Sequence, residues 1–253
     1  MATNGTVRAT ERRAAILASL SRDGAVQIDE VATALDVSSM TVRRDFDELE
    51  ADGLLRRVRG GAVAVNGPQP FGDRQRVNAR AKRVIAAKSA ELVPSSGAIA
   101  VDASSTTGTL VGDIGPRDGL TVATNSYDNF AAVRATPGVN PILIGGEAEK
   151  TTGSFVGMIA CEGAASLLYT RFFTSATGVD PTHGSSEVSL GEVQVKHAFG
   201  EHARSIVLCV DSSKLGRTSV AHGFAFDAIS VMITELDPTD ARLDEYRGMV
   251  ELR

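Results

Sequence analysis

Twelve arginines precede the first lysine, Lys82, and their side chains have the chemistry needed to read double-stranded DNA. A guanidinium group makes paired hydrogen bonds to a phosphate or to the edge of a guanine base. Thr41, Arg43 and Arg44 are expected near the start of a helix, and this part of a recognition helix contacts base edges. Arginines near Gly60-Gly61 in an expected hairpin can reach backbone phosphates. The residues expected to contact DNA are Ser38, Ser39, Thr41, Arg43, Arg44, Arg56, Arg57 and Arg59.

Small and polar residues follow each expected strand in the rest of the chain. The serine and threonine run at 104–107 precedes a helix, so its hydroxyl and N–H groups form a natural anion site. Lys214 adds a positive charge, and carboxylates such as Asp102 and Glu192 suit the hydroxyls of a sugar or polyol. A phosphorylated sugar needs both features. The residues expected at this site are Asp102, Ser104, Ser105, Thr106, Thr107, Asn125, Ser126, Gly145, Gly146, Glu147, Gly178, Asp180, Glu192, Asp211 and Lys214.

The arginines need a rigid support, and residues 1–65 have the pattern of a winged helix-turn-helix. The predicted elements are helices at 8–21, 29–35 and 38–51 and a hairpin at 54–65. Ser38 can cap the third helix. Val42, Phe46 and Leu49 share one face of that helix and should pack on the first two helices.

Acidic residues on the third helix limit how deeply it can enter a DNA groove. Asp45, Asp47 and Glu48 would repel phosphate, so only the first half of the helix is expected to enter. Asp47 and Glu48 stand four residues after Arg43 and Arg44. We therefore expect the ion pairs Arg43–Asp47 and Arg44–Glu48 to hold the guanidinium groups in position.

A second, larger domain follows a polar segment that contains Gly67, Pro68 and Pro70. Residues 66–80 are expected to form a linker, and residues 81–253 an α/β domain that begins with a helix at 81–92. The expected strands are 98–101, 120–124, 141–144, 172–175, 205–210 and 228–234. Helical stretches separate them, which favours a mainly parallel sheet covered by helices.

Composition agrees with a two-domain protein that binds nucleic acid through its first part. The chain has 253 residues and a net charge of −5, but residues 1–83 carry 14 basic and 11 acidic side chains, a net of +3. No apolar run is long enough for a membrane span, and residues 1–7 do not resemble a signal peptide, so a cytoplasmic protein is expected. Cys161 and Cys209 lack metal-ligand spacing, and the four histidines form no metal motif. We expect no metal, cofactor or catalytic residue.

The motifs at 35–38, 41–45 and 56–63 resemble the DNA-binding region of the DeoR family of bacterial transcriptional regulators. The resemblance continues at the strand-end motifs into the DeoR C-terminal sensor domain, which is similar in fold to sugar-phosphate isomerases of the ribose-5-phosphate isomerase type. It adds Lys196 to the expected ligand site. Two departures lie at or near this site: Ser104 replaces the usual glycine, and 192–197 reads Glu-Val-Gln-Val-Lys-His instead of Glu-Ala-Glu-Val-Lys-Arg.

The resemblance implies a repressor of a sugar or polyol catabolic operon that responds to a phosphorylated intermediate. Its partners would be operator DNA, the phosphorylated effector and further copies of the chain in a homodimer or homotetramer. The protein would be associated with the nucleoid when bound to its operator. The segment at 66–80 would transmit the ligand signal. Two alternatives are a sugar-phosphate isomerase-like enzyme, in which carboxylates and a lysine transfer protons, and an architectural DNA-binding protein without a ligand.

Overall fold

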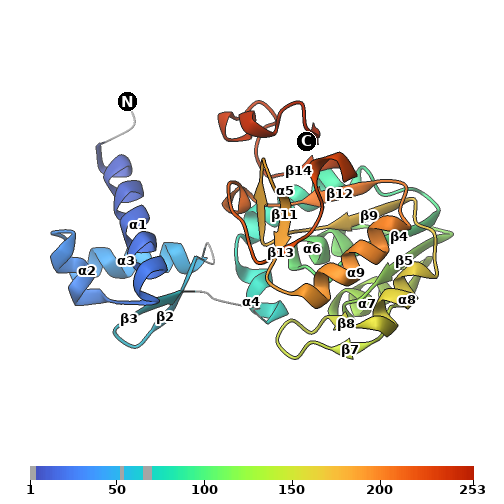
Figure 1. Cartoon of the computed structure of the whole chain (residues 1–253), viewed down its shortest axis with the longest axis horizontal. Coiled ribbons are helices and arrows are strands. Elements are labelled where there is room, and N and C mark those ends of the chain that lie inside the picture. The colour runs from blue at the N-terminus through green and yellow to red at the C-terminus, as the bar shows by residue number, and fades with distance from the viewer. Residues whose placement is uncertain (1–3, 52–53, 65–69) are drawn as a thin grey trace. The chain divides into compact units, whose positions relative to one another are not determined.

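The computed structural model describes residues 4–51, 54–64 and 70–253 (Figure 1). The chain divides into two compact units, residues 1–67 with 76–78 and residues 68–75 with 79–253. Each unit has its own apolar core, and the expected fold class is confirmed. The predicted domain boundary at residue 65 lies outside the described residues, as do Asp52 and Gly53, which were expected to end the third helix.

The first unit consists of three helices and a three-stranded antiparallel sheet. Its elements are α1 (Asn4–Asp23), β1 (Ala25–Gln27), α2 (Ile28–Ala34), α3 (Ser39–Ala51), β2 (Leu55–Val58) and β3 (Gly61–Ala64). Val42, Phe46 and Leu49 are fully buried against Ile16 and Leu20 of α1, as their helical spacing predicts. The β2–β3 hairpin forms the expected wing.

Strand β1 was not predicted, and it explains one of the wing glycines. β1 pairs with β3, which gives the strand order β1-β3-β2. A Cβ atom on Gly61 would lie 2.2 Å from the carbonyl oxygen of Val26. Gly61 is therefore required for the pairing of β3 with β1, independently of any approach of the wing to DNA.

The second unit is built on a seven-stranded, fully parallel sheet with the order β15-β14-β12-β9-β4-β5-β6. The strands are β4 (Gly97–Val101), β5 (Leu120–Thr124), β6 (Val139–Leu143), β9 (Arg171–Thr174), β12 (Ile206–Cys209), β14 (Ile229–Ile233) and β15 (Glu251–Leu252). Edge strand β6 contains Pro141, which lies opposite Val122 of β5. From β4 the chain adds β5 and β6 on one side, then β9, β12, β14 and β15 on the other, so the direction of strand addition changes between β4 and β9.

Helices cover both faces of this sheet (Figure 1). They are α5 (Ala79–Ala90), α6 (Ser105–Asp113), α7 (Tyr127–Arg134), α8 (Met158–Ala165) and α9 (Leu190–Glu201). Adjacent residues of β9 show the two layers, because Phe173 packs with Ile85 of α5 and Phe172 packs with Phe199 of α9. Within the described residues, no helix combines the length and apolar character that a membrane crossing requires.

Further elements frame the carboxyl ends of the strands, and the sequence did not predict them. They are the hairpin β7 (Glu147–Ala148) and β8 (Phe155–Val156), and the antiparallel sheet of β10 (Gly178–Asp180), β11 (Gly184–Glu187) and β13 (Ala221–His222). Three short 3₁₀ segments occur at Ser212–Lys214, Phe226–Ala228 and Ala241–Tyr246.

The linker prediction needs a correction, because helix α4 (Phe71–Arg76) forms inside the segment 66–80. α4 begins directly after Pro70, whose carbonyl oxygen accepts a hydrogen bond from the Arg74 N–H at 3.0 Å. Residues 68–75 belong to the second unit and residues 76–78 to the first. Part of the expected linker is therefore a helix that belongs mainly to the second unit.

Candidate functional site

Four of the arginines predicted to contact DNA have exposed side chains with no ion pair to any described residue. Arg43 and Arg44 lie in the first half of α3, and Arg56 and Arg59 lie on the wing. Ser38 caps α3, since its Oγ accepts the Thr41 N–H at 3.2 Å. The Ser39 hydroxyl donates to Asp29 of α2 at 2.9 Å. These two serines thus fix the start of the helix that carries Arg43 and Arg44.

The ion pairs expected on α3 are wrong, because its acids pair with arginines of other elements. Asp47 binds Arg57 of the wing, and Glu48 binds Arg13 of α1. The helix also bears Asp45, which is buried and takes two hydrogen bonds from Arg12, one of them at 2.8 Å.

This pairing changes the charge presented by α3. Asp47 and Glu48 are neutralised by arginines of other elements. Arg43 and Arg44 therefore keep their N–H donors available for an external partner. The same pairing means that the guanidinium of Arg57, expected on phosphate, is shared with Asp47.

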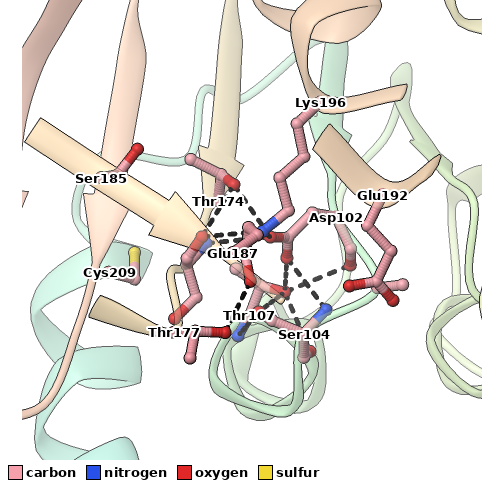
Figure 2. Close-up of polar contacts among 12 residues, drawn as sticks. Asp102, Ser104, Thr107, Thr174, Thr177, Ser185, Glu187, Glu192, Lys196 and Cys209 are labelled. Atoms are coloured by element: carbon pink, nitrogen blue, oxygen red, sulfur yellow. Dashed lines mark hydrogen bonds and ion pairs between the residues drawn. The ribbon is translucent and has the colours of Figure 1, made fainter. Parts of the chain in front are cut away.

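The second candidate site lies between β4 and β9, at the carboxyl edge of the parallel sheet. Ligands of open parallel sheets bind at such a point, where strand order reverses. Asp102 follows β4 and is fully buried. Its Oδ1 accepts from the Ser104 N–H at 3.0 Å and the Thr107 hydroxyl at 2.7 Å. Its Oδ2 accepts from the Thr174 hydroxyl at 2.8 Å and the Ser175 N–H at 2.9 Å (Figure 2).

Lys196 of α9 connects this aspartate to a second buried carboxylate. Its Nζ lies 3.0 Å from Asp102 Oδ2, donates to the Ser175 carbonyl at 2.8 Å and binds Glu187 Oε1 (Figure 2). Glu187, at the end of β11, also accepts from the Thr177 hydroxyl at 2.8 Å. The ammonium group therefore makes two hydrogen bonds and one ion pair within the protein.

The pKa values of this cluster follow from burial and from the shared lysine. Burial alone would lower the pKa of Lys196, but Glu187 and Asp102 raise it above its ordinary value. Burial opposes ionisation of Asp102, yet Lys196 and the hydrogen bonds from Ser175 and Thr107 hold its pKa below the usual range. The pKa of Glu187 is raised, because its burial outweighs the attraction of Lys196.

The hydrogen bonds and ion pairs that Asp102 and Lys196 make within the protein limit what else these side chains can bind. The carboxylate of Asp102 accepts four hydrogen bonds, as many as its oxygen lone pairs allow, and Lys196 makes two hydrogen bonds and one ion pair. Glu192 differs, since its Oε1 accepts from the Ser154 hydroxyl at 2.8 Å and its Oε2 accepts from no described residue. Asp102 and Lys196 thus connect the residues that follow β4 and β9 with β11 and α9, while Glu192 keeps one oxygen without a described partner.

The serine and threonine run forms the start of helix α6, as predicted. Ser104 is the N-cap, and its Oγ accepts the Thr107 N–H at 3.2 Å. The departure from the usual glycine at this position therefore supplies a helix cap. Ser105, Thr106 and Thr107 are buried in the first turn, where helix N–H groups favour an anion.

A buried lysine that the sequence analysis did not select stands beside this turn. Lys82 of α5 donates to Ser105 Oγ at 3.1 Å and to the carbonyl oxygen of Arg74 on α4. Burial lowers its pKa from 10.5 to about 8; nearby Asp211 opposes this shift, while Lys214 and Arg74 add to it. Lys82 therefore lies within reach of the charges of Arg74, Lys214 and Asp211.

Asn125 and Ser126, which follow β5, adjoin the same edge of the sheet. Asn125 Nδ2 donates to the Phe155 carbonyl of β8 at 2.9 Å, which leaves its Oδ1 buried without a hydrogen-bond partner among the described residues. Ser126 caps α7 through the Asn129 N–H at 3.2 Å, and Asn129 Nδ2 donates to the Asp102 carbonyl at 2.8 Å. This loop therefore supports the one that carries Asp102.

Other predicted site residues have structural contacts outside the Asp102–Lys196 network. A Cβ atom on Gly146 would lie 2.6 Å from the Val156 carbonyl oxygen, and one on Gly178 would lie 2.5 Å from the Arg217 carbonyl oxygen. Gly145 and Glu147 are exposed. Asp180 accepts hydrogen bonds from His183 and Thr182, and these bonds lower its pKa. Within the described chain, none of these residues bonds to Asp102 or Lys196.

The described residues also contain no group of three or more His, Cys, Asp and Glu side chains that could hold a metal ion.

The residues that sequence reasoning missed come from elements distant from the strand-end motifs. Glu187 lies in a short strand rich in glycine and serine, and Arg74 lies in the expected linker. Lys82 did carry a signal, because Lys82, Ile85, Ala86 and Ser89 form the buried stripe of α5 at helical spacing. A lysine within an apolar stripe indicates a buried charge with a specific partner.

Comparisons with known proteins cover nearly the whole chain. The model for a DeoR-like helix-turn-helix domain matches residues 12–67, and the model for a DeoR C-terminal sensor domain matches residues 77–236. The chain is 30% identical to the HTH-type transcriptional regulator IolR of Bacillus subtilis, over 88% of this chain and 89% of that protein. It is 31% identical to the lactose phosphotransferase system repressor of Lactococcus lactis, over 91% and 92%. It is 26% identical to the glycerol-3-phosphate regulon repressor of Escherichia coli, over 92% and 93%.

Solved structures include ribose 5-phosphate isomerase A from Methanocaldococcus jannaschii. It aligns with a TM-score of 0.40 and 18% identity over 55% of each chain. A likeness at this level carries no argument about activity.

Proposed function

Since this chain belongs to the DeoR family of transcriptional regulators, we propose that it represses a sugar or polyol catabolic operon under the control of a phosphorylated sugar or polyol. The observation that carries the proposal is the pairing of the charged side chains on α3. Arg43 and Arg44 have no partner among the described residues, while Asp47 and Glu48 beside them are neutralised from other elements. A helix start with free guanidinium groups and paired acids is suited to contact base edges and phosphates.

The strand-end site supports a ligand with both hydroxyl and phosphate groups. Glu192 Oε2 and the unpartnered Asn125 Oδ1 are acceptors for ligand hydroxyls. The start of α6, with Lys82 beside it, supplies positive potential for a phosphate, and Lys214 lies within reach of the charge of Lys82. We infer that Asp102 and Lys196 hold these groups in place. Two relatives of the chain are repressors of a lactose phosphotransferase system and of a glycerol-3-phosphate regulon, which agrees with a ligand of this class.

Regulation requires that the two sites influence each other. A single winged head contacts few base pairs, so we infer a homodimer or homotetramer whose heads bind half-sites about 34 Å apart or a multiple of that distance. The effect must be reciprocal: if the ligand weakens DNA binding about 100-fold, DNA weakens ligand binding by the same factor, about 2.7 kcal/mol.

A mobility-shift experiment tests the proposal directly. The full-length protein is incubated with DNA from upstream of its own gene, in excess competitor DNA, with and without a panel of sugar and polyol phosphates. We expect a specific shift that one or a few of the phosphates change. Lack of preference for any genomic fragment over competitor DNA would contradict the proposal. Turnover of a sugar phosphate at ordinary enzymatic rates would favour the isomerase alternative instead.

Single substitutions assign the contacts within that experiment. Arg43→Ala and Arg44→Ala should each weaken specific binding by about 1–3 kcal/mol if the side chain bonds a base edge. Arg134→Ala is a matched control, because Arg134 is an exposed arginine near the end of α7 in the other unit. Wild-type affinity in both α3 variants would refute the assignment of these arginines.

A further inference from the structure

Helix α4 lies between the two regions that the family models match. Those regions are 12–67 and 77–236, so neither includes Phe71–Arg76. The helix nevertheless packs on the loops of the strand-end site. Phe71 lies against the first turns of α6, since a Cβ atom on Gly108 would lie 2.9 Å from the Phe71 ring. α4 therefore covers the start of α6, where the proposed phosphate group would bind.

Arg74 is the residue of α4 that reaches furthest into this site. Its Nη1 donates to the Ala103 carbonyl at 3.3 Å, and its Nη2 donates to the Thr152 carbonyl at 3.2 Å. Ala103 follows β4, and Thr152 lies in the β7–β8 hairpin, so the guanidinium joins two loops of the site. Its Nε is buried and has no hydrogen-bond partner within the described chain.

This coordination leaves the guanidinium group incompletely satisfied. Two of its five N–H donors make hydrogen bonds to described residues, both of them longer than is usual for a charged donor. No carboxylate of the described residues forms an ion pair with Arg74; Glu149 lies near enough to feel its charge but is occupied by the N–H groups of Thr151 and Thr152. Arg74 as a whole is half-buried, but its Nε is buried, and leaving that N–H without an acceptor is costly. An anionic ligand that accepts from Nε would remove that cost.

Lys82 connects Arg74 to the helix start. Its ammonium group contacts the backbone carbonyl of Arg74 on one side and Ser105 Oγ of α6 on the other. An anion at the first turn of α6 would therefore lie next to Lys82. The same ammonium group contacts α4 through the carbonyl oxygen of Arg74.

We propose that Arg74 is a ligand-binding residue whose guanidinium turns from the carbonyls of Ala103 and Thr152 to the phosphate group of the effector. Binding of the ligand then alters the position of α4, and residues 76–78, which begin at the last residue of this helix, belong to the DNA-reading unit. The inference rests on the proposed function only in taking a phosphate ester as the ligand class.

The test uses the full-length protein and three variants. Arg74→Gln removes the charge, Arg74→Lys keeps it, and Arg83→Gln is the control, since Arg83 is an exposed arginine on α5. Titration calorimetry measures binding of glycerol 3-phosphate, glucose 6-phosphate and inorganic phosphate, with glycerol and glucose as unphosphorylated counterparts. Hydrogen exchange of residues 70–78 is followed with and without the phosphate compound that binds best.

We expect Arg74→Gln to weaken binding of the phosphate ester about 10- to 100-fold, the range for charge-assisted hydrogen bonds. Arg74→Lys should recover part of the affinity, and Arg83→Gln should bind as the wild type does. The ester should change exchange at 70–78 in the wild type and not in Arg74→Gln. If inorganic phosphate binds as tightly as the phosphate ester and also depends on Arg74, the role of Arg74 is supported and the ligand is the free ion.

Three outcomes would overturn the inference. Arg74→Gln could bind the phosphate ester with wild-type affinity, or it could lose affinity equally for the phosphorylated and unphosphorylated compounds. The third outcome is that the wild type binds no phosphate compound. DNA binding is measured separately on the same preparations. Specific DNA binding without Arg74-dependent ester binding would refute this inference alone. Arg74-dependent ester binding without specific DNA binding would refute the proposed function alone.

Discussion

Replacement of Lys82 by methionine should make the protein more stable at neutral pH and less stable at high pH. Lys82 is only 5% exposed, and burial lowers its pKa from 10.5 to about 8. A shift of this size means that the charged form destabilises the folded state by roughly 3 kcal/mol at pH 7. Methionine has a similar length and no charge, so it removes this cost.

The substitution also removes two hydrogen bonds, those to the Arg74 carbonyl and to Ser105 Oγ. Their loss costs about 1–2 kcal/mol in total, so Lys82→Met should stabilise the protein by about 1–2 kcal/mol at pH 7. The burial cost is complete below pH 8, where both states hold the proton. It declines as the pH rises to 10.5, because the folded state releases the proton before the unfolded chain does.

At pH 10 the remaining cost is about 1 kcal/mol, and the variant should no longer be more stable than the wild type. Urea unfolding followed by circular dichroism at pH 7 and pH 10 measures both differences. Lys150→Met is the control, because Lys150 is exposed in the β7–β8 hairpin and makes no such contacts. Parallel stability curves for wild type and Lys82→Met across this pH range would refute the reasoning.

Three further substitutions test the charge arrangement of each unit. Arg57→Ala should weaken binding to all DNA sequences and lower the slope of log affinity against log salt by about 0.9, and an unchanged slope would show that Asp47 keeps this arginine from phosphate. Arg12→Ala should destabilise the first unit by about 3 kcal/mol because it leaves Asp45 buried and unpaired; unfolding of the combined Arg12→Met and Asp45→Leu variant, which should recover most of the loss, provides the check. Lys196→Met should cost about 3–5 kcal/mol of unfolding free energy at pH 8 and less at pH 5, where its buried carboxylate partners can take up protons; equal losses at both pH values would contradict the proposed charge cluster.

The main sheet could be predicted from the sequence because its strands are short apolar runs that alternate with helices. β12 is buried at every position, as a strand covered on both faces must be. β1 and β11 could not be predicted in the same way. β1 is three residues long and is stabilised by pairing with β3, while β11 consists mainly of glycine and serine, which have little strand preference.

The linker prediction for residues 66–80 is wrong at α4 because proline does more than break regular structure. Proline is also favoured at or just before the start of a helix, and α4 follows Pro70 directly. Without α4, the sequence could not show that Arg74 lies at the strand-end site.

The candidate site was predictable where residues directly follow strands, because parallel strands bring their carboxyl ends together. Asp102, Ser104 and Asn125 were found for that reason. The expected roles were less reliable than the positions, since only the structure shows that the contacts of Asp102 are already complete within the protein. Glu187 required knowledge of how β11 packs, which no local pattern supplies.

Pro141 in strand β6 has a consequence for self-association. β6 is one edge of the seven-stranded sheet, and an edge strand can recruit a strand from another molecule through its free backbone groups. Proline has no N–H group to offer, so this edge cannot form an uninterrupted ladder with a neighbouring copy. Association of copies at this edge would therefore have to use side chains, and the sheet is protected against fibre-like growth from this side.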